Sequence, residues 1–155
     1  MAVFIESNLS SPLKKSDPRS GGAEPRFHGF RRIALRLPAL LIAAAIWGLS
    51  TQSILPQPKG ILGFDKVQHL IAYAALAFAL GLWFSPERWR RRPLGVFLLT
   101  AALAALYGAT DEVHQYFVPG RDCNVWDWIA DTLGAFLGAA AVWLAFRVVR
   151  GRKHG

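Results

Sequence analysis

Two long stretches of this chain carry no charged side chain, and they restrict its fold more than any other feature. No charge occurs from Ile71 to Phe84 or from Leu94 to Thr110. A helix on the surface of a soluble protein keeps one polar face, whereas a helix that is apolar all round is typical of a membrane span. We therefore expect an integral membrane protein and not a soluble helical bundle.

Four apolar runs provide the spans, over residues 33–55, 67–84, 94–109 and 125–149. A helix needs about 20 mostly apolar residues to cross a bilayer. The first, second and fourth runs meet this requirement, and the third meets it only if its helix continues past Ala109. The predicted fold is all-α, with four transmembrane helices in an antiparallel bundle.

Basic residues lie mainly on one side of this topology. Of the 18 Lys and Arg residues, all but Lys59, Lys66 and Arg121 lie at or before Arg36, in the loop 85–93, or at the C-terminal end of the fourth run. The positive-inside rule then places both termini in the cytoplasm, in a protein of the cytoplasmic (inner) membrane. Topology therefore explains the net charge of +8, and nucleic acid is not a predicted partner.

The domain organisation follows from composition. Residues 1–30 show no helical or strand period and predict a disordered, basic, cytoplasmic tail, followed by a transmembrane domain over 31–155. Proline and glycine predict a loop over 55–63, and prolines at both ends predict a short hydrophilic turn over 85–93. Pro-Gly within 118–121 indicates a type II turn.

Acidic residues show the opposite bias, because six of the ten lie near the predicted outer ends of the helices. Spacings of four residues place polar side chains on one stripe of each of three helices. We expect the stripes to meet as a polar network or ligand-binding site. Its members are Asp65, Lys66, His69, Tyr73, Asp111, Glu112, Gln115, Arg121, Asp127 and Asp131.

Three interpretations of this cluster remain open. It could be a structural network, with Asp65 as an N-cap and Asp127 as a first-turn acid. It could be a recognition site for a polar or cationic group. It could also be catalytic, with His69, Asp111 and Glu112 as candidates. No metal-binding motif is present, so neither a metal nor another cofactor is predicted.

Charge is the central difficulty of the predicted cluster. Six acids face two nearby fixed cations, which leaves about four surplus negative charges at membrane depth, where each is costly. Arg121 is expected either to pair with Asp111 or Glu112, or to clamp an anionic ligand. The aromatic residues of this region are expected to form an interfacial belt: Tyr116, Phe117, Trp126 and Trp128.

Three segments carry a resemblance to a known family. DKVQHLIAYAALA (65–77), DEVHQYFVPGRDC (111–123) and DWIADTLGAFLGA (127–139) resemble the VanZ-like family of small bacterial membrane proteins, within roughly residues 40–145. The resemblance implies a four-helix membrane protein of the cell envelope. Asp131 stands where many members carry asparagine, so the resemblance does not support a role for a neutral amide there.

The resemblance also implies a function at the envelope. The family's founding member is associated with low-level resistance to teicoplanin, a glycopeptide antibiotic. This implies binding or handling of an envelope ligand, with an envelope lipid or a cell-wall-related molecule as partner besides the lipid bilayer. The alternatives are an enzyme that modifies a lipid-linked or phosphorylated headgroup, and a structural or accessory subunit without a ligand.

Overall fold

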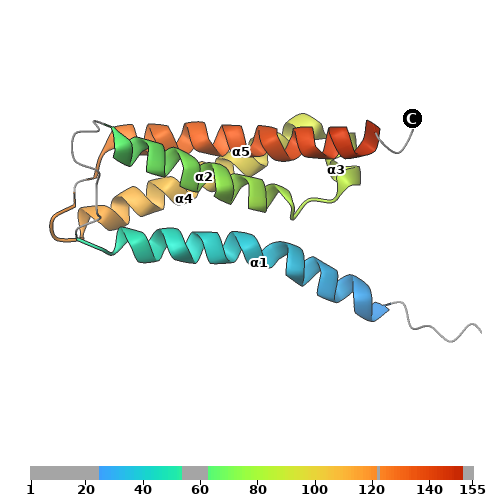
Figure 1. Ribbon diagram of the computed structural model, residues 1–155, viewed down its shortest axis with the longest axis horizontal. Coiled ribbons are helices and arrows are strands. Elements are labelled where there is room, and N and C mark those ends of the chain that lie inside the picture. Colours follow the sequence, from blue (N-terminus) through green and yellow to red (C-terminus); the bar gives the residue numbers. More distant parts are fainter. Residues whose placement is uncertain (1–24, 54–62, 122, 152–155) are drawn as a thin grey trace, which may run out of the picture.

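The computed structural model describes residues 25–53, 63–121 and 123–151, and within these residues it contains helices and no strand. The helices are α1 (Pro25–Ser50), α2 (Phe64–Gly81), α3 (Pro86–Arg91), α4 (Pro93–Tyr116) and α5 (Val125–Gly151), as Figure 1 shows. The all-α prediction is thus confirmed for the described part of the chain.

Three of these helices are long and apolar enough to cross a membrane: α1 over Ile33–Ser50, α4 over Pro93–Tyr116, and α5 over Val125–Val149. The helix α4 continues through Asp111 and Glu112, as its length requires. Its 24 residues extend for about 36 Å at 1.5 Å per residue. The acids therefore belong to the last turns of a spanning helix and not to the loop that follows it.

The structure differs from the sequence-based expectation at three element ends. The segment 85–93 contains the helix α3, because the hydroxyl of Ser85 accepts from the amide of Arg88 and Pro86 starts the helix. The N-cap of α2 is Gly63, so the expectation that Asp65 would cap this helix is wrong.

The third difference is at the start of the first helix. The helix α1 begins at Pro25, inside the segment 1–30 that the sequence predicted to be disordered. The rest of that segment, and most of the predicted loop 55–63, lie outside the described residues.

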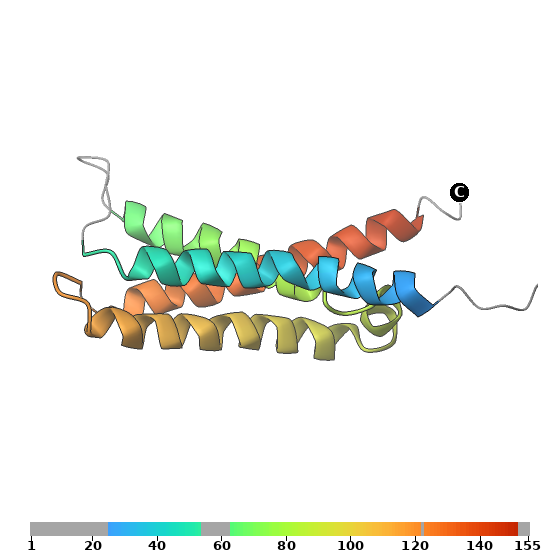
Figure 2. The ribbon, with the colours of Figure 1, turned by 90° about the horizontal axis from the view of Figure 1, so that it is seen from below.

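The ends of four helices meet at one end of the molecule. Figures 1 and 2 both place the C-terminal ends of α1 and α4 beside the N-terminal ends of α2 and α5. A turn over 118–121 connects α4 towards α5. Gly120 has φ +81°, and the amide of Arg121 donates to the carbonyl of Val118, which are the features of the predicted type II turn.

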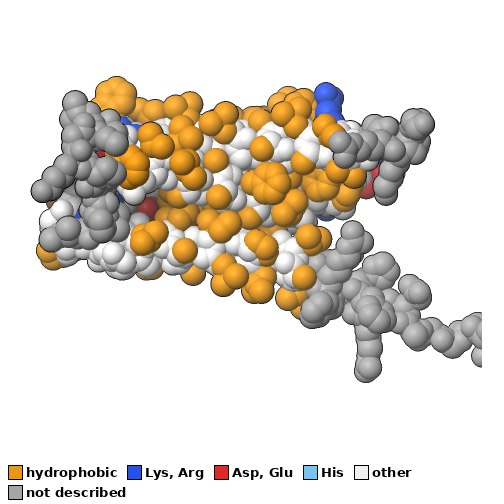
Figure 3. Space-filling view, in the orientation of Figure 1, with side chains coloured by type: hydrophobic (Ala, Val, Ile, Leu, Met, Phe, Trp, Pro, Cys, Tyr) orange, Lys and Arg blue, Asp and Glu red, His pale blue; other side chains and the backbone are white. Residues whose placement is uncertain are grey.

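Side chains are distributed in the opposite way to those of a soluble protein. The interior contains small residues such as Ala77, Ala104 and Ala135, each fully buried, together with several polar side chains. Large apolar side chains such as Leu94 and Leu106 point outward, and charged side chains show only near the two ends in Figure 3. Lipid is the solvent that such a surface requires.

The backbones of α2 and α5 approach each other closely, and glycine makes this possible. A methyl group at Gly134 would overlap the backbone carbonyl of Leu70, and one at Gly138 would overlap that of Ala74. The spacing Gly134-x-x-x-Gly138 is therefore a packing face between two helices.

The opposite end of the molecule is basic and aromatic. Trp89 of α3 is buried and donates from Nε1 to the carbonyl of Gly81 at 3.0 Å, which satisfies the end of α2. Arg147 stacks on the ring of Trp143, with 4.2 Å between the guanidinium carbon and the ring centroid. Such pairs of cation and aromatic ring are common at the membrane–water interface.

The loop at this end carries its own ion pairs. Glu87 accepts hydrogen bonds from Arg90 and Arg91, and these hydrogen bonds lower the pKa of its carboxyl to about 2. Glu87 therefore stays ionised and offsets part of the positive charge of the loop.

Candidate functional site at the polar end of the helices

A single ammonium group links the starts of α2 and α5. Lys66 Nζ lies 2.8 Å from Asp65 Oδ2 and 2.8 Å from Asp127 Oδ1. Asp65 and Asp127 each occupy the first turn of their helix, where the helix dipole favours an acid. The expected first-turn position of Asp127 is confirmed.

A largely buried pair joins α2 to α5. His69 Nδ1 lies 2.8 Å from Asp131 Oδ1, and Asp131 has no exposed surface. Gly108 of α4 makes room for this carboxylate, since a methyl group there would lie 2.8 Å from Asp131 Oδ2. Tyr73, one turn further along α2, has its ring nearly parallel to that of His69. Residues of α2, α4 and α5 therefore surround the contact between His69 and Asp131.

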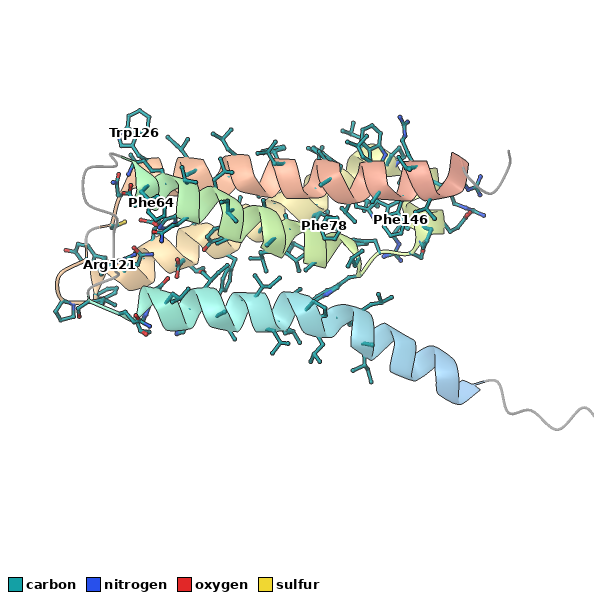
Figure 4. The ribbon with its side chains drawn as sticks, viewed as in Figure 1. Phe64, Phe78, Arg121, Trp126 and Phe146 are labelled. Atoms are coloured by element: carbon teal, nitrogen blue, oxygen red, sulfur yellow. The ribbon has the colours of Figure 1, made fainter. Side chains whose placement is uncertain are left out.

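A chain of hydrogen bonds crosses the end of α4. Gln115 Nε2 donates to Asp111 Oδ2 at 3.1 Å and to Ser50 Oγ at 3.5 Å. Arg121 Nη2 donates to Gln115 Oε1 at 2.7 Å. Of the two expectations for Arg121, direct pairing with Asp111 or Glu112 is not met, because the structure gives it an amide as partner, and the clamping of an anionic ligand stays a prediction. The reason is local, because the turn over 118–121 follows directly on the end of α4 and keeps Arg121 beside it (Figure 4).

Glu112 is held from the start of α5. Its Oε2 accepts from the backbone amide of Asn124 at 2.9 Å, and only 4% of the residue is exposed. Asn124 also accepts from the amide of Trp126 through its side chain. One residue thus caps α5 and orients a carboxylate of α4.

Several buried polar atoms have no hydrogen-bond partner among the described residues. They are Tyr73 Oη, Asp111 Oδ1, Glu112 Oε1, Asp131 Oδ2, His114 Nε2 and Thr132 Oγ1. Each carboxylate therefore uses one oxygen for a hydrogen bond within the protein and leaves the other without one. A buried acceptor without a donor costs free energy. A cation or a hydrogen-bond donor bound at this end of the molecule would therefore be stabilised by these oxygens.

The charge balance points in the same direction. The described residues of the cluster include five carboxylates, those of Asp65, Asp111, Glu112, Asp127 and Asp131, and two fixed cations, those of Lys66 and Arg121. The sixth acid of the predicted cluster, Asp122, lies outside the described residues. Three negative charges therefore remain uncompensated by Lys or Arg in the described part of the cluster.

One subset of the cluster has the arrangement of a metal site. His69, Glu112 and Asp127 each offer one ligand atom, and these atoms lie within 4.8 Å of one another. The three residues come from α2, α4 and α5. The sequence contains no motif for such a site, because the ligands come together only when the three helices pack.

All ten predicted positions lie at this end of the molecule, and sequence reasoning missed three further contributors. Ser50 and Asn124 supply hydrogen bonds, and Gly108 supplies space. Asn124 had a detectable signal, since an asparagine directly before an apolar helix is a preferred N-cap. Ser50 and Gly108 had none, because their roles depend on contacts between helices.

These features define the class of the protein. Its described helices include three that can span a membrane, its large apolar side chains point outward, and its polar side chains are buried at one end. It is a multi-pass helical membrane protein.

A comparison with protein families identifies the family. The model of the VanZ/LLP1 family matches residues 2–147, so the chain belongs to this family. The expected membership is thereby confirmed. No curated protein and no solved structure gives a significant match.

Proposed function

We propose that this protein crosses the cytoplasmic membrane four times and binds a polar or charged ligand of the cell envelope at the outer ends of α2, α4 and α5. The observation that carries the proposal is the set of buried carboxylate oxygens without partners, on Asp111, Glu112 and Asp131. A network whose only purpose was to hold helices together would pair these atoms, because each unpaired one is unfavourable.

The fourth span in this proposal is α2. Its 18 residues extend for about 27 Å at 1.5 Å per residue, close to the thickness of the hydrocarbon layer. Asp65 and Lys66 lie in its first turn, where they can reach the headgroup region. The concentration of Lys and Arg at the other end supports cytoplasmic termini.

Reporter fusions test this topology. A reporter that is active only outside the cytoplasm should be active when fused after Gln57 or Pro119, and inactive when fused after Glu87. Enzymatic activity of the fusions in whole cells, normalised to protein level, is the measurement. Activity only at Glu87 would reverse the orientation, and equal activity at all three sites would exclude four spans.

The chemistry of the site indicates the kind of ligand. The unpartnered groups include three carboxylate oxygens and one phenol, and three surplus negative charges surround them. Cationic groups and hydrogen-bond donors such as ammonium, amide and hydroxyl groups match the carboxylate oxygens, and the phenol can donate or accept. Envelope lipids and cell-wall precursors present such groups at the outer leaflet, and a role in teicoplanin-type resistance would act through the same site.

Native mass spectrometry tests ligand binding directly. Protein purified in a mild detergent should retain a co-purified envelope molecule at one copy per chain. Asp111→Asn should reduce its occupancy about tenfold or more, the loss expected from removing a charged hydrogen-bond partner of about 1.5–3 kcal/mol. Both forms should elute identically in size-exclusion chromatography.

The matched control is Glu87→Gln, which removes an acid at the basic end and should leave occupancy unchanged. The same two variants, expressed in a teicoplanin-susceptible host, extend the comparison to the resistance phenotype. Equal occupancy in the wild type and Asp111→Asn would contradict the proposal. Loss of Asp111→Asn from the membrane, with Glu87→Gln unaffected, would support the purely structural interpretation.

One observation favours a second candidate function. His69 is held by Asp131 at 2.8 Å, in the arrangement of a general base and the acid that orients it. An enzyme acting on a lipid-linked or phosphorylated headgroup would use His69 in this way, with Asp111 and Glu112 beside it. Turnover of the co-purified ligand by the wild type, and not by His69→Gln, distinguishes this candidate from binding alone.

A further inference from the structure

We propose that His69, Glu112 and Asp127 bind a divalent transition-metal ion, Zn²⁺ or Mn²⁺, at the polar end of α2, α4 and α5. This inference rests on the proposed function and deepens it, because it names a component of the same site. The ligand atoms lie within 4.8 Å of one another. Atoms bound to one Zn²⁺ ion are about 3.5 Å apart, so a shift of about 1 Å closes the site.

The state of Glu112 supports a cation independently of this spacing. The residue is 4% exposed, its Oε2 is held by the amide of Asn124, and its Oε1 has no partner among the described residues. A buried carboxylate is unfavourable unless it is paired or coordinates a metal. The fixed cations of the region are already engaged, Lys66 with Asp65 and Asp127, and Arg121 with Gln115.

A carboxylate holds one ring nitrogen of His69, as is common for metal-bound histidines. Its Nδ1 contacts the fully buried Asp131 Oδ1 at 2.8 Å, which leaves Nε2 as the ring nitrogen for a metal. A carboxylate on the far ring nitrogen fixes the tautomer and direction of a ligating imidazole. Asp131 is therefore a positioning residue, and Gly108 provides the space it occupies.

The ligand set determines the class of ion. An imidazole nitrogen favours Zn²⁺ and other transition metals, while carboxylates are shared by Zn²⁺, Mn²⁺ and Mg²⁺. One nitrogen and two carboxylates therefore favour Zn²⁺ or Mn²⁺ over Mg²⁺ or Ca²⁺. Three protein ligands also leave a coordination position open for a water molecule or for an oxygen of the envelope ligand.

Metal titration of the full-length protein tests the proposal. Protein in detergent is first stripped with a chelator and then titrated with ZnCl₂ or MnCl₂ by calorimetry and equilibrium dialysis. We expect one ion per chain. His69→Gln and Glu112→Gln should each weaken binding at least tenfold, and Asp131→Asn by about tenfold to a hundredfold, as for other residues that orient a metal ligand.

Two matched controls separate this site from the other ionisable groups. His114→Gln changes the half-buried histidine that stacks on Trp47, and Glu87→Gln changes an acid at the opposite end. Both should bind Zn²⁺ within about twofold of the wild type, because neither residue belongs to the three-residue ligand set. The proposal is overturned if the wild type binds no ion saturably, or if His69→Gln and Glu112→Gln both bind like the wild type.

A measurement on the wild type avoids any folding defect of a variant. Pulsed electron paramagnetic resonance of the Mn²⁺ form should show coupling to a histidine nitrogen, and its absence would exclude His69 as a ligand. Native mass spectrometry with and without chelator separates the two proposals. If protein that binds no metal still retains the envelope molecule, the metal proposal is overturned and the ligand proposal stands. Metal binding without an envelope molecule would support the metal site and overturn the ligand proposal.

Discussion

Gly138→Ala should lower the free energy of unfolding by about 2 kcal/mol, a typical cost of overpacking a close contact. The added methyl group would overlap the backbone carbonyl of Ala74 on α2. A flexible side chain could move aside, but a backbone carbonyl moves only if the two helices separate. Gly134→Ala should have a similar effect, because its methyl group would overlap the carbonyl of Leu70. Unfolding with SDS in mixed micelles provides the measurement.

Two other glycines serve as controls for this effect. Gly48 in α1 and Gly95 in α4 have open space where a methyl group would lie. Gly48→Ala and Gly95→Ala should leave stability unchanged or raise it by up to about 1 kcal/mol, because alanine is the better helix former. If all four substitutions were equally tolerated, α2 and α5 would not be in contact through their backbones.

Asp131→Ala should destabilise the protein by about 2 kcal/mol, the cost of leaving a buried polar group without its partner. The substitution removes the oxygen that lies 2.8 Å from His69 Nδ1, in a place with no exposed surface. Asp131→Asn keeps an oxygen at this position and should cost less than about 1 kcal/mol, since the amide has nearly the same shape. The same SDS unfolding experiment measures both variants.

The comparison with Asp65→Ala shows whether burial is the cause. Asp65 also contacts a side chain of opposite charge, Lys66, but 43% of its own side chain is exposed. An exposed ion pair contributes at most about 1 kcal/mol, so Asp65→Ala should have the smaller effect. A stabilising effect of Asp131→Ala would mean that the surplus negative charge outweighs the hydrogen bond to His69.

The helices could be predicted from sequence because their signals are local. Apolar runs of sufficient length produced α1, α4 and α5, and the turn at Pro119-Gly120 has the predicted positive φ at glycine. The ends were less predictable. Ser85 followed by Pro86 is a standard helix start that sequence reasoning assigned to a turn. Asp65 has the chemistry of an N-cap but lies two residues after Gly63, which occupies that position.

The location of the site could be predicted from the sequence, but its side-chain contacts could not. Four-residue spacing was enough to bring Asp65, His69, Asp111 and Asp131 to one end of the molecule. It could not pair His69 with Asp131, because the pairing depends on the rotation of α2 relative to α5. The spacing also could not show that Arg121 contacts the amide of Gln115, because the carboxylates of Asp111 and Glu112 lie close by in the sequence as well.

The glycine contact between α2 and α5 also sets the dimensions of the site. Leu70 is next to His69, and Gly134 is one helical turn from Asp131, so the place where the two backbones touch adjoins the place where imidazole and carboxylate meet. The distance between the imidazole of His69 and the carboxylate of Asp131 therefore depends on how closely glycine lets α2 and α5 approach. A single added carbon at either glycine should therefore change the width of the site, whereas the loop between α4 and α5 acts on it through Arg121 and Asn124, which hold Gln115 and Glu112.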